Sequence, residues 1–225
     1  MTIGIIVAMD KELALLLPLL GEYSTASING FTFYTGENSG HKLVACKCGI
    51  GKVNAAIGAL TLIDTYHPAI VINTGVAGGT GATEEPARVL DVVLASEVAY
   101  HDVWCGPGTV KGQAAGCPAR FACPLPADIR ERLGVMEGLV ASGDIFVDDP
   151  ADLQRILALY PDAKAVDMES GAIAQVCELK SVPFVCIRVV SDTPGDGGNS
   201  AAYESFWNDA PLRTFHKVEK LLSLL

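Results

Sequence analysis

Three acidic residues, Glu12, Glu169 and Asp192, stand where a layered α/β protein would place chemistry. Each lies at or shortly after the carboxyl end of a segment with the pattern of a buried strand, and ligands of open α/β sheets bind at that end. No histidine accompanies them at metal-ligand spacing. The pattern therefore indicates acid/base work on a neutral, hydroxyl-rich substrate, and we expect no metal and no cofactor.

Each of these acids also has a purely structural explanation. Glu12 and Glu169 would both stabilise the positive N-terminus of the helix that follows them. Asp192 would fit a turn ahead of Pro194. Taken singly, each residue is explained more simply in this way, and the argument for a site depends on all three facing one crevice.

Apolar segments alternate with helical patterns along the chain. We predict strands over residues 2–8, 42–48, 69–73, 92–98, 138–142, 165–168 and 184–191. We predict helices over residues 10–20, 53–66, 127–133, 150–159, 170–179 and 205–224. Several strands are almost continuously apolar, which is typical of strands buried on both faces. The expected fold is α/β: one three-layer domain spanning 1–225, with a mixed, mostly parallel central sheet flanked by helices.

Two glycine-rich segments follow predicted strands. Segment 48–53 opens a helix but fails the phosphate-loop pattern, because Cys46 replaces the first glycine and Val53 replaces the Ser/Thr that would hold magnesium. Segment 73–79 could bring backbone amides close to an anion or a sugar, or it could be a tight crossover turn. The motif by itself leaves both readings open.

Composition limits the range of partners. The chain has 16 basic and 26 acidic residues, a formal net charge of −10, and no basic run. Nucleic acid and anionic membrane surfaces are therefore not expected as partners. No signal peptide pattern and no window of about 18 apolar residues is present. The odd number of cysteines, seven, and their placement in apolar runs indicate free thiols in a reducing cytoplasm.

Ordered blocks along nearly the whole chain resemble the 5'-methylthioadenosine/S-adenosylhomocysteine nucleosidases, which have the nucleoside phosphorylase fold. The blocks are IGII with AM and Glu12, GIGKVNAA from 49, INTG from 72, AGG from 77, YHD from 100, GQ from 112, GCP from 116, SGD from 142, Phe146, AVDME from 165, AQVC from 174, VPFV from 182, and Arg188 with Ser191 and Asp192.

The resemblance implies a division of labour among the three acids. Glu12 would activate a water that attacks the anomeric carbon of ribose. Asp192 would protonate N7 of the purine, so that adenine leaves as a neutral base. Glu169 would accept hydrogen bonds from the 2'- and 3'-hydroxyls, with Met168 against the sugar. Carboxylates also suit an oxocarbenium-like transition state.

The same resemblance implies further contacts with the nucleoside and with Asp192. Phe146 would stack on adenine and the backbone of Val147 would read its edge. Arg188 and Ser191 would support Asp192. The remaining expected substrate contacts are an apolar slot for the 5'-thioalkyl group, made by Met9, Ile50, Tyr203 and Phe206, and the turn that contains Val76 and Gly78.

The chain departs from the family pattern at several positions; Asp10-Lys11, Val7 and Leu90 remove no proposed catalytic group, and two other departures bear on the substrate. Val76 stands where serine is usual, which removes a hydroxyl near the sugar, and the loop at 104–107 differs from better-known members. Homodimerisation is also expected from the resemblance. The apolar stripe of the predicted C-terminal helix (Phe215, Val218, Leu221 and Leu222) is compatible with it, although such a stripe is more often intramolecular core.

Three alternative functions remain. A purine nucleoside phosphorylase would use phosphate in place of water, but it needs arginines near the first glycine-rich turns, and Arg88 is the one nearby candidate. An aminodeoxyfutalosine-type nucleosidase would use the same pocket. A non-catalytic nucleoside sensor would not require an acid/base pair.

Overall fold

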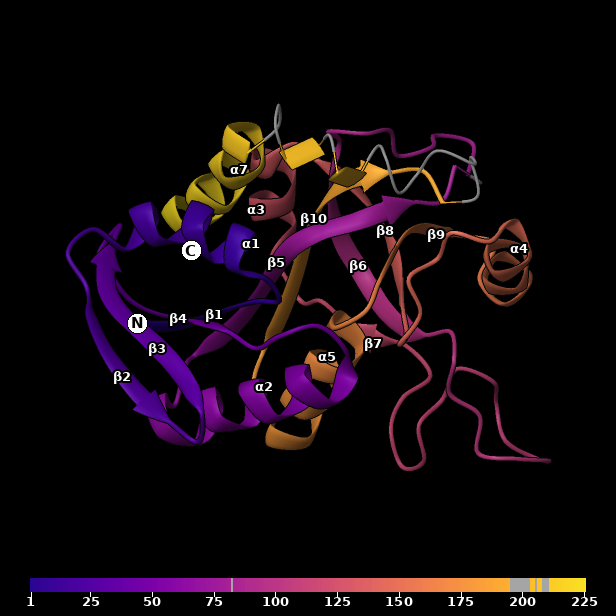
Figure 1. The fold of residues 1–225 in the computed structure, drawn as a ribbon, viewed down its shortest axis with the longest axis horizontal. Helices are drawn as coiled ribbons and strands as arrows, with labels where there is room; N and C mark the ends of the chain where they lie inside the picture. The colour runs from indigo at the N-terminus through magenta and orange to yellow at the C-terminus, as the bar shows by residue number, and fades with distance from the viewer. Residues whose placement is uncertain (82, 195–202, 205, 208–210) are drawn as a thin grey trace.

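The computed structural model describes residues 1–81, 83–194, 203–204, 206–207 and 211–225 (Figure 1). The strands are β1 (Thr2–Val7), β2 (Ser24–Ile28), β3 (Phe31–Asn38), β4 (His41–Lys47), β5 (Ile70–Gly79), β6 (Val92–Tyr100), β7 (Phe121–Ala122), β8 (Met136–Ser142), β9 (Ala163–Asp167) and β10 (Phe184–Asp192). The helices are α1 (Asp10–Leu16), the 3-10 turn η1 (Leu17–Leu20), α2 (Lys52–Tyr66), α3 (Ala127–Leu133), α4 (Pro150–Leu159), α5 (Ser170–Lys180) and α7 (Pro211–Leu224).

The strands form one mixed sheet in the order β10-β6-β8-β9-β5-β1-β4-β3-β2, with β7 beside β6. Because β10 also pairs with β5, the five strands β5, β9, β8, β6 and β10 close into a ring. Among the seven predicted strands, the β6–β10 and β5–β9 pairs are antiparallel. Their other pairs are parallel. The predicted α/β class with a mostly parallel central sheet is confirmed.

Helices cover both faces of the sheet. In Figure 1, α2 and α5 lie below the strands, while α1, α3 and α7 lie above them. Each face has its own apolar core: Leu62 and Ile173 belong to the lower one, and Leu16, Leu133 and Leu221 to the upper one. This arrangement leaves the carboxyl ends of β1, β5, β9 and β10 free to hold a site between the layers.

The hairpin β2–β3 is absent from the sequence prediction. Its turn is Asn29-Gly30, with φ of 51° and 82°, and the next turn, Ser39-Gly40, has φ of 51° and 76°. Both turns join antiparallel strands, and two left-handed residues in a row are typical of the tight type I' hairpin turn. The Asn-Gly pair is typical of such a turn and could have predicted this hairpin.

Two predicted boundaries are wrong, and a third falls partly outside the described residues. Strand β5 continues through Gly79, so segment 73–79 is a strand end and not a turn. Helix α1 stops at Leu16 and tightens into a 3-10 turn, because Pro18 cannot donate the hydrogen bond that would continue it. The last predicted helix is described as α7 from Pro211, and residues 205 and 208–210 lie outside the described chain.

Candidate active site

A pocket opens where β1, β5, β9 and β10 end, with about 630 Å³ of empty volume including its mouth. This size is ordinary for a small-molecule site. Twelve of the fourteen predicted site residues line it: Met9, Glu12, Ile50, Val76, Gly78, Phe146, Val147, Met168, Glu169, Ser191, Asp192 and Tyr203. Arg188 and Phe206 lie behind this lining. The remaining lining residues, which sequence reasoning missed, are Ala8, Ala77, Ile145, Val166, Asp167 and Pro194.

Glu12 is held in place by backbone donors. Its Oε2 accepts from the N–H groups of Ala8 (2.9 Å) and Met9 (3.0 Å), and its Oε1 accepts from the N–H of Val76 (3.0 Å). The side chain thus caps its own helix and reaches across to β5. Burial raises the pKa of Glu12 above its usual value, against the opposing effect of Arg188 and the three N–H donors. Glu12 can therefore both cap its own helix and act as an acid/base group in the pocket.

Gly75 makes room for that carboxylate. A Cβ atom at this position would collide with Oε1 of Glu12 and lie 2.8 Å from Nη1 of Arg188, and the backbone has φ of +153°. The glycine segment was predicted to let the backbone approach a ligand closely. At Gly75 the missing side chain makes room for Glu12 and Arg188. The neighbouring Val76 donates its N–H to Glu12, and its side chain packs on the cluster of Val189 and Phe206.

Arg188 is fully enclosed beneath the pocket. Its Nη2 donates to Oδ1 of Asn73 and to Oδ2 of Asp167, and the guanidinium also attracts Glu12 and Glu169 electrostatically. The family resemblance implies that Arg188 supports Asp192. Its two described hydrogen bonds run instead to Asn73 and Asp167, because β10 lies next to β5 and the Arg188 side chain reaches the end of β9.

Glu169 is the N-cap residue of helix α5 and faces the loop before α2. Its Oε1 accepts from the N–H of Gly51 at 2.9 Å. Burial, followed by the nearby charge of Asp167, raises the pKa of Glu169 to about 7, although Arg188 and the Gly51 N–H oppose the rise. Proton uptake at Glu169 near neutral pH would consequently alter the charge of the pocket.

Asp192 ends strand β10 and is 3% exposed. Its Oδ1 accepts from the hydroxyl of Ser191 at 2.6 Å. The predicted support of Asp192 by Ser191 thus has a direct geometric counterpart. Gly78 lies on the adjoining strand β5. A Cβ atom at this position would lie only 2.5 Å from Cγ of Pro194.

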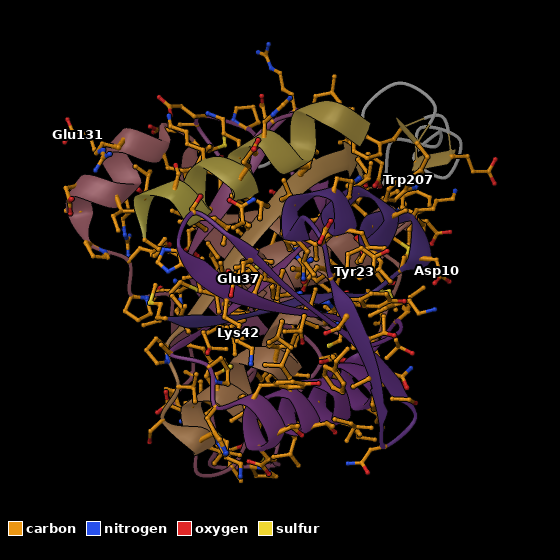
Figure 2. The ribbon with its side chains drawn as sticks, turned by 90° about the vertical axis from the view of Figure 1, so that its left-hand side faces the viewer. Asp10, Tyr23, Glu37, Lys42, Glu131 and Trp207 are labelled. Carbon is orange, nitrogen blue, oxygen red and sulfur yellow. The ribbon has the colours of Figure 1, made fainter. Side chains whose placement is uncertain are left out.

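Aromatic side chains form the opposite wall. Phe146 and Tyr203 meet edge to face, with ring centroids 5.9 Å apart, and the hydroxyl of Tyr203 donates to Sδ of Met9 at 3.1 Å. Phe206 is buried behind this wall against Trp207. Figure 2 shows Trp207 on the side of the molecule where Asp10 begins α1, and the Nζ of Lys11 lies 5.3 Å from the Trp207 ring centroid.

Asp167 is the most informative omission from the predicted site. It lies within the block AVDME, one position before Met168, so the resemblance could have identified it. Its Oδ1 accepts from the hydroxyl of Ser170 at 2.7 Å and its Oδ2 from Arg188. Asn73, which lies beneath the lining, was also not predicted, and its amide links Arg188 to the carbonyl of Ile6.

The described cysteines form no disulfide. All seven cysteines are free, and all except Cys105 are buried. Among the described residues, no group of three His, Cys, Asp or Glu side chains is placed to hold a metal ion. In the same part of the chain, no helix is both long and apolar enough to cross a membrane.

Comparison with known proteins identifies the family. The model of the phosphorylase superfamily matches residues 2–223. A 5'-methylthioadenosine/S-adenosylhomocysteine nucleosidase from Anoxybacillus flavithermus is 38% identical over 235 residues, covering 100% of this chain and 99% of the relative. The solved nucleosidase of Neisseria meningitidis, in complex with methylthio-immucillin-A, has a TM-score of 0.91 and 35% identity, covering 100% of this chain and 99% of that one.

The solved nucleosidase of Streptococcus pneumoniae, in complex with 8-aminoadenine, has a TM-score of 0.93 and 34% identity, with 100% of both chains covered. These similarities extend over the whole fold and include each strand end that lines the pocket. The chain belongs to the phosphorylase superfamily and, within it, to the 5'-methylthioadenosine/S-adenosylhomocysteine nucleosidases.

Proposed function

We propose that this chain hydrolyses the N-glycosidic bond of 5'-methylthioadenosine and S-adenosylhomocysteine, releasing adenine and the 5-thioribose product. One observation carries the proposal: four buried carboxylates, those of Glu12, Asp167, Glu169 and Asp192, line the pocket above one buried guanidinium, that of Arg188. Cleavage of a glycosidic bond develops positive charge on the sugar ring. A preorganised excess of carboxylates stabilises that charge.

Glu12 is suited to activate the water. Burial raises its proton affinity, and three backbone donors hold its orientation, so it can accept a water proton without moving. The water oxygen bonds to C1', the C1'–N9 bond breaks, and its electron pair enters the purine. Asp192 supplies a proton to N7, so neutral adenine leaves. Glu12 ends the step protonated and Asp192 ionised, and proton exchange with solvent restores both.

Glu169 and the aromatic wall place the nucleoside. The Glu169 carboxylate, fixed by the Gly51 N–H, accepts hydrogen bonds from the ribose hydroxyls, with Met168 beside the sugar. Phe146 stacks on adenine and the Val147 backbone reads its edge. Met9, Ile50, Val76 and Tyr203 form the apolar slot for the thioalkyl group, with Phe206 behind it.

Valine at position 76 is compatible with this chemistry. The contact made to Glu12 uses the backbone N–H, which any residue except proline supplies. The side chain packs against the cluster that contains Phe206, so it exchanges a polar contact near the sugar for apolar support of the aromatic wall. We therefore expect retention of hydrolysis, with a preference for apolar 5'-substituents.

Hydrolysis fits the pocket better than phosphorolysis. None of the described lining residues is a lysine or arginine, so nothing there would neutralise a phosphate dianion beside Glu12. The test is adenine release from methylthioadenosine, adenosylhomocysteine and inosine by the purified protein, with and without inorganic phosphate. We expect phosphate-independent release from the two thio-nucleosides. A strict phosphate requirement would indicate a phosphorylase, and tight binding without release would indicate a sensor.

We propose a homodimer, as the family resemblance implies, but through helix α2 and not through the C-terminal stripe. Val218, Leu221 and Leu222 are buried in the core of the chain itself. In contrast, Ile50, Val53, Ile57 and Leu60 are 54%, 70%, 47% and 41% exposed. The spacing of Val53, Ile57 and Leu60 places them on one face of α2, and Ile50, which lines the pocket, lies in the loop just before this helix. A second copy of the chain is the occupant that we propose.

Val53→Glu, on the outer face of α2, tests this surface. The charge would be buried in a dimer and solvated in a monomer, so the variant should halve the mass measured by light scattering. An unchanged dimer mass would contradict α2 as the interface. We also propose a cytoplasmic location, consistent with the free thiols, and a single domain over 1–225, consistent with the one sheet that links the first and last strands.

A further inference from the structure

The loop at 49–52 touches the pocket on one side and a polar cluster on the other. The N–H of Gly51 donates to Oε1 of Glu169 at 2.9 Å, while the next N–H, of Lys52, points away and donates to Oδ1 of Asp144 at 2.7 Å. Gly51 has φ of +93°, and a Cβ there would lie 3.1 Å from Oδ1 of Asp144. The direction of the Gly51 N–H therefore depends on how Lys52 is held.

Asp102 holds both partners of this arrangement. Its Oδ2 accepts from Nζ of Lys52 at 2.8 Å and from the N–H of Asp144 at 2.9 Å. The two side chains of the ion pair are only 24% and 15% exposed, so water screens it less than it would a surface pair. Burial opposes ionisation of Asp102, but the hydrogen bonds from Lys52 and Asp144 outweigh it and lower the pKa of Asp102.

The Asp102 carboxylate is connected to two walls of the pocket through its hydrogen-bond partners. Asp102 follows β6 and Asp144 follows β8, and the segment that continues from Asp144 carries Phe146 and Val147 into the lining. Lys52, Asp102 and Asp144 are not themselves lining residues. Whatever they contribute must reach the nucleoside through the loops that they join.

We infer that Lys52 and Asp102 are positioning residues that fix the Gly51 N–H on Glu169 and the 144–147 segment against the base. The inference rests on the proposed role of Glu169 as the acceptor for the ribose hydroxyls. One ion pair then sets the distance between the sugar side and the base side of the pocket. A change of about 1 Å in this distance can lower the rate about 100-fold.

Lys52→Met tests the inference in two backgrounds. Methionine keeps an apolar stem near the Tyr100 ring, which Nζ of Lys52 approaches at 5.4 Å, but removes the ammonium. We expect Lys52→Met to lower kcat/KM for methylthioadenosine by about tenfold or more. In the Glu169→Gln background the further loss should be clearly smaller, because coupled residues are not additive and only the contribution through the 144–147 segment should remain.

Lys180→Met is the matched control. Lys180 pairs with Asp64 at 2.7 Å and joins α5 to α2 away from the pocket, so its loss should leave kcat/KM unchanged. Equal losses from Lys52→Met in both backgrounds would overturn the positioning role. A Glu169→Gln variant with normal kcat/KM would overturn the proposed function of Glu169, and the present inference with it.

Asp102 offers an independent measurement that separates positioning from stability. Among the described residues, its Oδ1 is buried and has no hydrogen-bond partner. Asp102→Asn keeps an oxygen that can accept from Lys52 and Asp144, whereas Asp102→Ala keeps none. We expect Asp102→Asn to retain most activity and Asp102→Ala to lose as much as Lys52→Met. Equal activity of the two Asp102 variants, at equal Tm, would contradict the inference.

Discussion

The pocket has two halves that are held by different forces. The charged half contains Glu12 and Glu169, fixed by backbone N–H groups and by the buried Arg188. The aromatic half contains Phe146 and Tyr203, fixed by edge-to-face ring contacts, and Phe146 is 45% exposed. Backbone donors cannot rotate away, whereas a ring at the surface can adjust to a ligand.

Substitutions in the charged half and in the aromatic half should therefore change different kinetic constants. Interactions that strengthen as charge develops on the sugar lower the barrier and govern kcat. Ring contacts with the base are made equally in the ground state and the transition state, so their loss raises KM.

The largest expected effect is that of Asp192→Asn. The amide keeps the shape and can still accept from Ser191, but it cannot transfer a proton to N7. We expect kcat to fall by about 10³-fold or more, with an unchanged thermal melt. Adenine release under saturating methylthioadenosine measures it. Near-normal activity of this variant would remove Asp192 from the mechanism.

Gly75→Ala should damage the charged half without touching the substrate. The new Cβ would displace the Glu12 carboxylate or Arg188. We expect kcat to fall by about 10²-fold, because a shift of about 1 Å is costly for a general base. Gly40→Ala is the control, since it also has positive φ (+76°) but meets nothing within 4 Å. It should lose some stability and no activity.

Phe146→Ala should affect binding more than turnover. Stacking of a base on an aromatic ring is worth about 1–3 kcal/mol, so KM should rise by about tenfold while kcat changes less than about twofold. Tyr23→Ala is matched to it, because Tyr23 is also 45% exposed and meets Tyr34 edge to face at 5.6 Å, in a different part of the molecule (Figure 2). A fall in kcat as large as the rise in KM would contradict the division of the pocket into a charged half that governs kcat and an aromatic half that governs KM.

The smallest effect concerns stability and pH. The folded-state pKa of Glu169 is raised to about 7 from an ordinary 4.5, so its stabilising proton is present at low pH and is lost as the pH rises through 7. Glu169→Gln, which stays neutral, should melt a few degrees (about 2–6 °C) above the parent at pH 8 and near it at pH 5.

Glu131→Gln, an exposed change on α3 (Figure 2), serves as the control for that melt and should show no such pH dependence. A melting difference between Glu169→Gln and the parent that is the same at pH 5 and pH 8 would contradict the assignment of the raised pKa to Glu169.

Much of the site could be predicted because its residues follow apolar strands. The strands around Ile5, Ile72 and Val185 are buried on both faces, so their positions, and the ends that carry Glu12 and Asp192, are readable from the sequence. The hairpin at Asn29 was missed because β2 is exposed along almost its entire length and has no apolar pattern, although its partner β3 buries Phe33. The strand character of Gly75 was missed because glycine also suits a turn.

Most of the elements, the acids at their ends and the family to which the chain belongs are predictable from the sequence. Only the tertiary structure decided which groups meet: Arg188 reaches Asn73 and Asp167, and the Gly51 N–H reaches Glu169 across 118 residues of chain. Periodicity records which residues are buried, since burial is set by each element's own pattern. It does not record partners, because buried hydrogen bonds depend on how strands from distant parts of the chain are placed side by side.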